Sequence, residues 1–345
     1  MTKSLAVAAA FLSTGLISLA PNVLLFLFPN YSASTSQSSA NKAMLSLGQA
    51  LAVGGLMGDV FLHTLPDCFG QEGDRHGNSH SHGHKNHDHE SHHEGEDVGV
   101  RVLAGFAVFL LLDIIVRSLD PDGHSHNHSN ATTNGTCDGS KATAHHTTKS
   151  QWRLIFSSAV LLNLIGDALH NFTDGLAIGA TFAASHIPST AFEASSPMSW
   201  LSSSFALLKS RGGLASMSVF LHEIPHELGD FATLVNAGMS RNMAIGLQFV
   251  TAVAAFLGTA LGLFSSQIIE GLGHDVLLPF TAGGFIYLAC TTILPEILET
   301  RVSAFVRILQ ICSFATGLAF MYAVGVLEEM EAHDKHSHHH DHGEL

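Results

Sequence analysis

Long apolar runs dominate this sequence of 345 residues. A helix needs about 20 mostly apolar residues to cross a bilayer, a length that a soluble core does not require. Charged residues make up only 13% of the chain, against roughly 25% in a typical soluble domain. The sequence therefore predicts an all-α membrane protein with eight transmembrane helices, at residues 4–28, 44–65, 98–119, 152–184, 213–237, 242–268, 276–298 and 303–327.

The first apolar run has a second interpretation as a signal peptide, because Lys3 precedes it. The run continues to Phe28, whereas the apolar core of a signal peptide spans about 7–15 residues. The bond after Ala20 also leads into Pro21, a poor context for cleavage. We expect a retained span, with cleavage as the open alternative. An even number of spans places both termini on one side of the membrane.

Two of the runs share a motif at a constant offset. Gly54-Gly55 is followed by Leu65-Pro66-Asp67, and the same pattern returns 229 residues later as Gly283-Gly284 and Leu294-Pro295-Glu296. The second and seventh spans cross in opposite directions, which is the signature of an inverted repeat in secondary transporters. We predict that spans 1–3 and 6–8 form related halves around a central pair, spans 4 and 5.

The central pair carries ionisable residues that a bilayer disfavours. In span 4, polar residues at three- and four-residue spacing share one helix face: Asp167, His170, Asn171 and Asp174. In span 5, two histidines four residues apart adjoin a stripe of acids: His222, His226, Glu223, Glu227 and Asp230. A charge at the bilayer centre costs ~2.5–3.5 kcal/mol on insertion scales. A dication offsets this cost, since imidazole and carboxylate both ligate zinc. The alternative is a set of hydrogen-bonded pairs that hold the helices together.

Histidine is the outlier of the composition. Of 25 histidines, 19 lie in three polar tracts, 76–93, 124–146 and 333–342. His-rich tracts are typical of metal binding, although an inert solvated loop is the alternative. We expect His-rich loops at 70–97 and 120–150 and a His-rich tail at 331–345, within one transport domain over 1–345. The formal charge is −14 and no basic stripe occurs, so we expect no nucleic-acid partner.

The segment from His222 to His226 also matches HExxH, a motif in which two histidines bind zinc and the glutamate acts as a base. An intramembrane zinc metalloprotease using residues 222–226 is therefore an alternative function. Pro225 inside the motif and the second ligand stripe on span 4 favour a conduction site instead. The third hypothesis is a zinc sensor or scaffold that does not transport the ion. No Walker sequence or nucleophile elbow occurs, so we expect no enzyme and no cofactor besides the transported ion.

At residues 170–175 and 222–230 the chain resembles the ZIP (Zrt/Irt-like) metal transporters, and specifically their LIV-1 subfamily. The eight-span layout and the His-rich loops extend the resemblance over nearly the whole chain. The run 229–235 is similar to the endomembrane branch, whose members release zinc from the endoplasmic reticulum or Golgi into the cytosol. No large ectodomain precedes span 1, which fits an internal membrane. The resemblance implies a homodimer with lumenal termini, and cytosolic, unmodified sequons at Asn127, Asn130 and Asn134.

The resemblance also implies a binuclear metal centre between spans 4 and 5. Its primary site is expected to comprise His170, Asp174, His222 and His226. Around the second site we expect Asn171, Asp174, Glu223 and His226, and Glu227 is a further candidate metal ligand. On span 2, Asp59 and His63 are i, i+4 and extend the path outward. Glu296 and Gln248 are weaker candidates for that role, and Asp113 with Arg117 forms an ordinary i, i+4 ion pair.

The expected substrate is Zn²⁺, moved by passive or secondary transport from an organelle lumen to the cytosol. Histidine and carboxylate ligands also suit iron, manganese and cadmium, and the affinity order alone does not choose among them. The imidazole of His222 makes the site richer in nitrogen than a carboxylate there would, which favours zinc.

Overall fold

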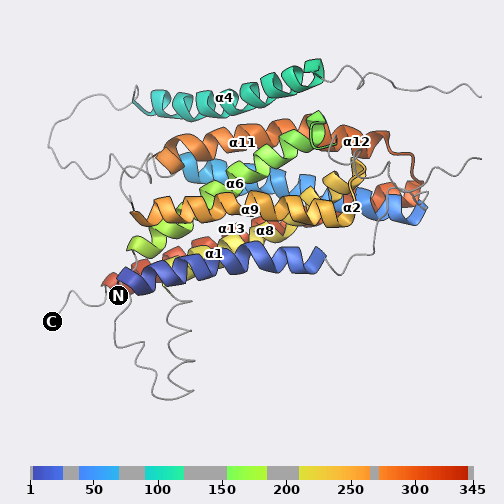
Figure 1. Ribbon diagram of the computed structural model, residues 1–345. Coiled ribbons are helices and arrows are strands. Elements are labelled where there is room, and N and C mark those ends of the chain that lie inside the picture. Colours follow the sequence, from blue (N-terminus) through green and yellow to red (C-terminus); the bar gives the residue numbers. More distant parts are fainter. Residues whose placement is uncertain are drawn as a thin grey trace, which may run out of the picture.

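A computed structural model of the chain describes residues 3–25, 39–69, 90–119, 154–184, 210–264 and 272–340. All regular elements within these ranges are helices, which run along one another in a single bundle (Figure 1). In chain order they are α1 (Lys3–Leu25), α2 (Ser39–Gly58), η1 (Asp59–Thr64), α4 (Glu90–Leu119), α6 (Ser158–Ala184), α8 (Arg211–Asn236), α9 (Arg241–Phe264), η3 (Leu272–Leu277), α11 (Leu278–Tyr287), η4 (Leu288–Ile293), α12 (Leu294–Glu299) and α13 (Ala304–His340).

Six segments are long and apolar enough, by length and composition, to cross a membrane. They are Ser4–Val23, Asn41–Phe69, Asp97–Leu119, Arg241–Phe264, Asp275–Glu299 and Ala304–Val326. The expectation of an all-α, multi-pass membrane protein is therefore confirmed. The other two predicted spans correspond to α6 and α8, which have 27 and 26 residues but carry the ionisable stripes that lower their hydropathy. The count of eight stays a prediction.

The His-rich tract at 124–146 and the first part of the tract at 76–93 lie outside the described residues. The end of the expected loop at 70–97 belongs to α4, which begins at Glu90. Most of the expected tail at 331–345 belongs to α13, which continues to His340.

The helices pack in two sets. In the first set, α1, α6, α8 and α9 contact one another, and in the second set α2 packs on α13 while α4 packs on α11. The sets meet mainly where α8 contacts α2, with further contacts between α6 and both α4 and α11. The two stripes of ionisable residues therefore lie on helices at the boundary between the sets.

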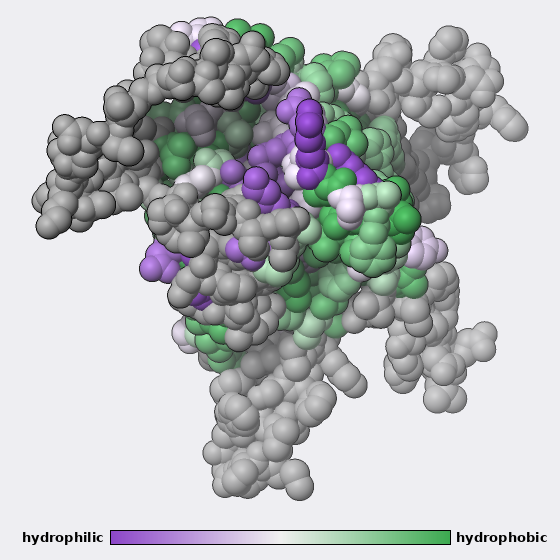
Figure 2. All heavy atoms as spheres, turned by 90° about the vertical axis from the view of Figure 1, so that its right-hand side faces the viewer, coloured by the Kyte–Doolittle hydropathy of each residue, from purple (hydrophilic) through white to green (hydrophobic). Residues whose placement is uncertain are grey.

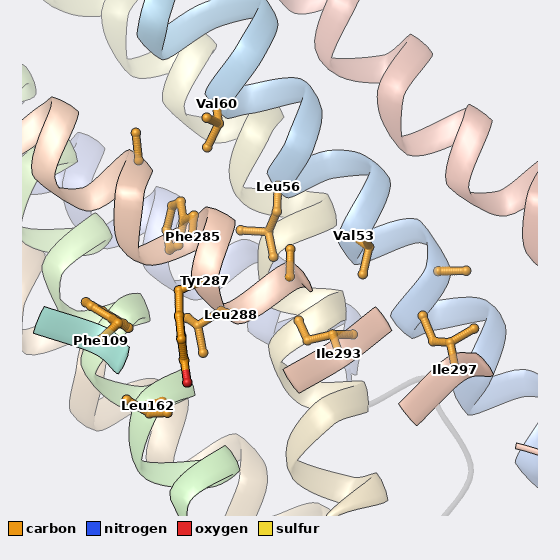
Figure 3. Close-up of a cluster of buried hydrophobic side chains, with 13 residues drawn as sticks. Val53, Leu56, Val60, Phe109, Leu162, Phe285, Tyr287, Leu288, Ile293 and Ile297 are labelled. Carbon is orange, nitrogen blue, oxygen red and sulfur yellow. The ribbon is translucent and has the colours of Figure 1, made fainter. Parts of the chain in front are cut away.

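An apolar cluster fills part of the second set. It includes Val53 and Leu56 of α2, Phe285 of α11, Ile293 of η4 and Ile297 of α12, all of them buried (Figure 3). Figure 3 shows these side chains converging from α2 on one side and from the α11–α12 segment on the other. Burying an aliphatic side chain of this size contributes roughly 1.5–3 kcal/mol, so the cluster ties the two segments together.

Glycine lets these helices approach closely. A Cβ atom added at Gly54 of α2 would collide with the carbonyl oxygen of Phe314 in α13. A Cβ atom added at Gly283 of α11 would collide in the same way with the carbonyl oxygen of Val102 in α4. Small residues at such positions allow backbone-to-backbone packing between membrane helices.

Two helices change to π-helical geometry halfway along. α2 continues into η1, and α11 continues into η4, with helical backbone angles at each junction. A π-turn accommodates one extra residue per turn and often occurs at functional sites. Each π-segment is followed within two residues by a proline, Pro66 after η1 and Pro295 after η4. The sequence pattern predicts neither of these π-segments.

The close approach at Gly54 generates a test of the packing. We expect Gly54→Ala to destabilise the protein by about 1–3 kcal/mol, because overpacking forces the neighbouring backbone to shift. The thermal unfolding midpoint of the purified protein in detergent measures this loss. Gly246→Ala in α9 is the matched control, since nothing lies within 4 Å of a Cβ added there. Equal midpoints for the two variants would contradict the packing.

Candidate metal centre

Four ligand-type side chains from α6 and α8 converge between the two helices. They are His170, Asp174, His222 and Glu223, and one ligand atom of each lies within 4.8 Å of the other three. Nε2 of His222 lies 2.9 Å from Oδ2 of Asp174, and Nε2 of His170 lies 3.5 Å from the same oxygen. Ligand atoms around a tetrahedral zinc, each at 2.0–2.2 Å from the metal, stand about 3.4 Å apart. The spacing therefore fits one dication.

Helical periodicity explains why these residues meet. His170 and Asp174 are four residues apart on α6, and His222 and His226 are four residues apart on α8, so each pair lies on one face of its helix. α8 remains helical through Pro225. Glu223 comes next to His222, and its Oε1 lies 3.9 Å from Nε2 of His170.

His226 completes the cluster by stacking. Its ring lies parallel to that of His170, with centroids 4.5 Å apart and planes inclined by 12°. Phe285 of α11 covers both rings, with centroid distances of 5.2 Å to His170 and 5.5 Å to His226. The three imidazoles are thus held against one another by α6, α8 and the second set of helices.

The side chains of the cluster are largely buried, which matters for its energetics. His222, Glu223 and His226 expose only 4%, 3% and 5% of their surface. Among the described residues, Nε2 of His226 and Nδ1 of His222 are buried without a hydrogen-bond partner. Leaving such a group unsatisfied costs about 1–3 kcal/mol. A bound cation would satisfy one of these nitrogens directly and would neutralise the acids beside them.

A cavity of about 220 Å³ joins this cluster to the surface. His170, Asp174 and His222 line its inner part. Asp59 and His63 of η1 also line it, and the ring of His63 lies 6.3 Å from that of His222. The structure therefore brings both outward candidates to the same cavity. Asp67, which follows η1 and is exposed, lines it as well and was not among the predicted ligands.

Two of the predicted ligands, Glu227 and Asn171, form hydrogen bonds to polar side chains outside the group of four. Oε1 of Glu227 accepts a hydrogen bond of 3.3 Å from Nδ2 of Asn22 in α1. Nδ2 of Asn171 donates to Oδ1 of Asp167 at 2.6 Å. Neither Glu227 nor Asn171 is in the group of four that could share one ion. Asn22 was missed, although a lone amide in the apolar first run was a visible signal.

The remaining candidates lie elsewhere. Gln248 of α9 donates through Nε2 to the backbone oxygen of Glu227 at 2.8 Å. Asp113 accepts from Nε of Arg117 at 2.7 Å, which confirms the predicted ion pair, and it also accepts from the hydroxyl of Tyr287 at 2.7 Å. Glu296 is bonded to Gln49 and Asn236 and is not among the residues that line the cavity.

Comparison with known proteins identifies the family to which this chain belongs. The ZIP Zinc transporter family matches residues 4–192 and 204–325. The chain is 33% identical to zinc transporter SLC39A7 of Mus musculus, over 92% of this chain and 69% of the relative. It is 35% identical to zinc transporter zipt-7.1 of Caenorhabditis briggsae, over 90% and 77%. With zinc transporter ZIP13 of Rattus norvegicus it shares 32% identity, over 76% and 65%. The resemblance predicted from the sequence is thereby confirmed, and the chain belongs to the ZIP family of zinc transporters.

Proposed function

We propose that this chain moves zinc, by passive or secondary transport, from an organelle lumen to the cytosol through the site between α6 and α8. The observation that carries this proposal is the buried group His170, Asp174, His222 and Glu223, whose atoms have the spacing of ligands around one ion. Membership of the ZIP family supports zinc as the substrate.

The cavity suggests how an ion reaches the site. Asp59, His63 and Asp67 offer oxygen and nitrogen ligands along its wall. A hydrated dication can exchange water for these ligands in steps, so it never meets the apolar interior without partners. At the buried end of the cavity, Asp174 and Glu223 supply negative charge and the histidines supply neutral nitrogen donors, a combination typical of zinc. His226 and Asn171 are proposed as further ligands that adjust as the ion binds.

Family membership argues against the metalloprotease alternative. The relatives that match most of this chain are zinc transporters by name. A zinc protease also leaves one metal position open for a catalytic water. Here Asp174 and His170 of a second helix lie 2.9 Å from His222 and 3.9 Å from Glu223 of the HExxH segment, respectively. The protein is accordingly a transporter and not an enzyme.

We also propose eight membrane spans related by an inverted repeat. Gly54 of α2 packs against Phe314 of α13, and Gly283 of α11 packs against Val102 of α4. The repeat relates these two contacts, because residues 54 and 283 differ by 229 positions and residues 102 and 314 differ by 212. The same two offsets relate a further pair of contacts, Gly317 on Leu51 and Gly105 on Phe280. The π-segments 59–64 and 288–293 also differ by 229. Helices at every predicted span, including α6 and α8, support the count.

We propose the oligomeric state, the membrane and the orientation of the transporter from its resemblance to the ZIP family. We infer a homodimer in the endoplasmic reticulum or Golgi membrane, with both termini in the lumen. In Figure 1, α1 begins at the end of the bundle at which α13 finishes, which supports an even number of spans. The His-rich segments at 70–97 and 331–345 then gather lumenal zinc, and the segment at 120–150 receives or senses it in the cytosol.

Removing a ligand tests the transport site. In proteoliposomes loaded with a zinc-sensitive dye, we expect His170→Ala and Asp174→Ala to lower zinc flux at least about tenfold. Each variant loses a direct metal ligand, and even the loss of a residue that only orients a ligand lowers metal affinity or activity by about 10–100-fold. Glu299→Gln, which removes an exposed carboxylate outside the cavity, is the control. Flux that is unchanged in well-folded His170→Ala and Asp174→Ala protein would remove the proposed site.

The ligand chemistry predicts a pH dependence. Imidazole binds zinc only when neutral and carboxylate only when ionised, so protons compete with the metal. We therefore expect zinc flux at a fixed low zinc concentration to fall between about pH 7.5 and about pH 5.5, across the range in which histidine titrates. Excess zinc should restore much of the flux at the lower pH. Flux that rises on acidification would contradict a site built from histidine and carboxylate.

The proposed orientation predicts the fate of the sequons. Asn127, Asn130 and Asn134 follow the third span, so lumenal termini place them in the cytosol. We expect no change in gel mobility on deglycosylation, because only lumenal sequons are modified. A glycan at any of the three would invert the orientation and the direction of transport.

A further inference from the structure

Three polar side chains from α2, α8 and α12 form a bridge that the transport site does not use. Nε2 of Gln49 donates to Oε2 of Glu296 at 2.8 Å, and Nδ2 of Asn236 donates to Oε1 of Glu296 at 2.5 Å. Nδ2 of Asn236 also lies 3.4 Å from Oε1 of Gln49. Gln49 is fully buried. Both oxygens of one carboxylate are thus held by amides from two different helices.

This bridge lies on the far side of the metal site from the cavity. Gln49 precedes Asp59 by ten residues along α2, and Asn236 follows His226 by ten residues along α8. At a rise of 1.5 Å per residue each separation is about 15 Å. The cavity extends the other way, past His63 to Asp67. Figure 2 looks onto the end of the bundle at which α2 begins and α12 finishes, where hydrophilic side chains gather among hydrophobic ones.

An apolar layer separates the bridge from the metal site. Val53 lies one helical turn beyond Gln49 toward the metal site, and Ile293 lies three residues before Glu296 on the same side; both are buried and belong to the apolar cluster of Figure 3. Zinc leaving the site at this end would have to pass between α8 and this layer. Apolar packing and then the polar bridge therefore lie between the metal site and this end of the bundle.

The bridge also joins the two sets of helices. Asn236 is the last residue of α8, which packs with α1, α6 and α9, whereas Gln49 and Glu296 belong to α2 and α12 in the other set. Exposing the site at this end requires α8 to separate from α2 and α12. That separation would break the bonds from Asn236 and leave the Glu296 carboxylate to water or to a passing ion.

The position of Glu296 in the repeat strengthens this argument. Glu296 follows η4 and Pro295 as Asp67 follows η1 and Pro66, at the offset of 229 residues. Asp67 is exposed and lines the open cavity, whereas Glu296 is half-buried in the bridge at the closed end. In an inverted repeat the two conformations exchange the environments of such a pair.

We propose that Gln49, Asn236 and Glu296 form the inner gate of the zinc path. The bridge holds the inner end shut while the cavity is open, and it breaks when the site turns to the other side. This assignment rests on the proposed transport function, because a gate has meaning only for a path.

Thiol accessibility tests the gate without relying on zinc flux. In full-length protein in which Cys68, Cys137, Cys290 and Cys312 are replaced by serine, Val53→Cys reports on the inner end and Ala177→Cys reports on the cavity, which Ala177 lines. Each reporter is combined with Gln49→Met, which keeps the length of the side chain but loses its hydrogen bonds, and separately with Asn236→Ala. The rate of labelling by a charged, membrane-impermeant methanethiosulfonate is measured in proteoliposomes, from each side.

We expect both gate variants to label Val53→Cys about tenfold faster than the parent, because hydrogen bonds to a charged group are lost from one conformation only. Labelling of Ala177→Cys should slow in the same variants, since the two ends open alternately. A merely structural tie would not produce this reciprocal change. Ser313→Ala is the control, because its bond to the carbonyl of Leu47 joins α13 and α2 within one set.

Unchanged labelling of both reporters in folded Gln49→Met and Asn236→Ala protein would overturn the gate. So would faster labelling of both reporters together, which would indicate general loosening. Zinc flux in the parent protein is measured alongside. Flux with unaltered accessibility would reject the gate and keep the transport function, whereas absent flux in the parent would reject the transport function itself.

Discussion

The cost of placing charge inside a bilayer is the constraint on which this structure depends. α6 and α8 carry the acids and histidines, and the more apolar α1, α2, α9 and α11 contact them. The side chains of His222 and Glu223 are almost fully withdrawn from water. Charged groups inside a bilayer persist only when they face partners inside the bundle. A transported dication is the partner that matches the donors and their spacing.

The same constraint accounts for the two unequal ends of the proposed path. One end holds a cavity lined by Asp59, His63 and Asp67, which can replace the water around an ion. The other end closes with buried aliphatic side chains and one carboxylate tied between two sets of helices. A path open at both ends would leak, so a carrier must alternate between such arrangements. The paired glycine contacts and paired π-segments suit a chain whose halves can exchange roles.

Local spacing made part of this account predictable. Residues three and four apart share a helix face, so spacing alone predicts that His170 lies beside Asp174 and that His222 lies beside His226. Contacts between distant segments were not predictable in this way. Gln49, Asn236 and Glu296 meet across 247 residues of sequence, and two of them are uncharged amides with no periodic signal. The π-geometry of η1 and η4 likewise depends on packing, and the orientation of Glu227 toward Asn22 depends on where α1 docks.

Zinc binding by purified protein without its His-rich segments is the most direct test that the buried histidines and acids hold an ion. With residues 76–93 and 124–146 and the tail from 333 deleted, isothermal titration calorimetry reports only sites inside the bundle. We expect saturable zinc binding that is lost when His222 and Asp174 are both replaced by alanine. A truncated, folded protein that takes up no zinc, or one whose binding survives that double replacement, would contradict it.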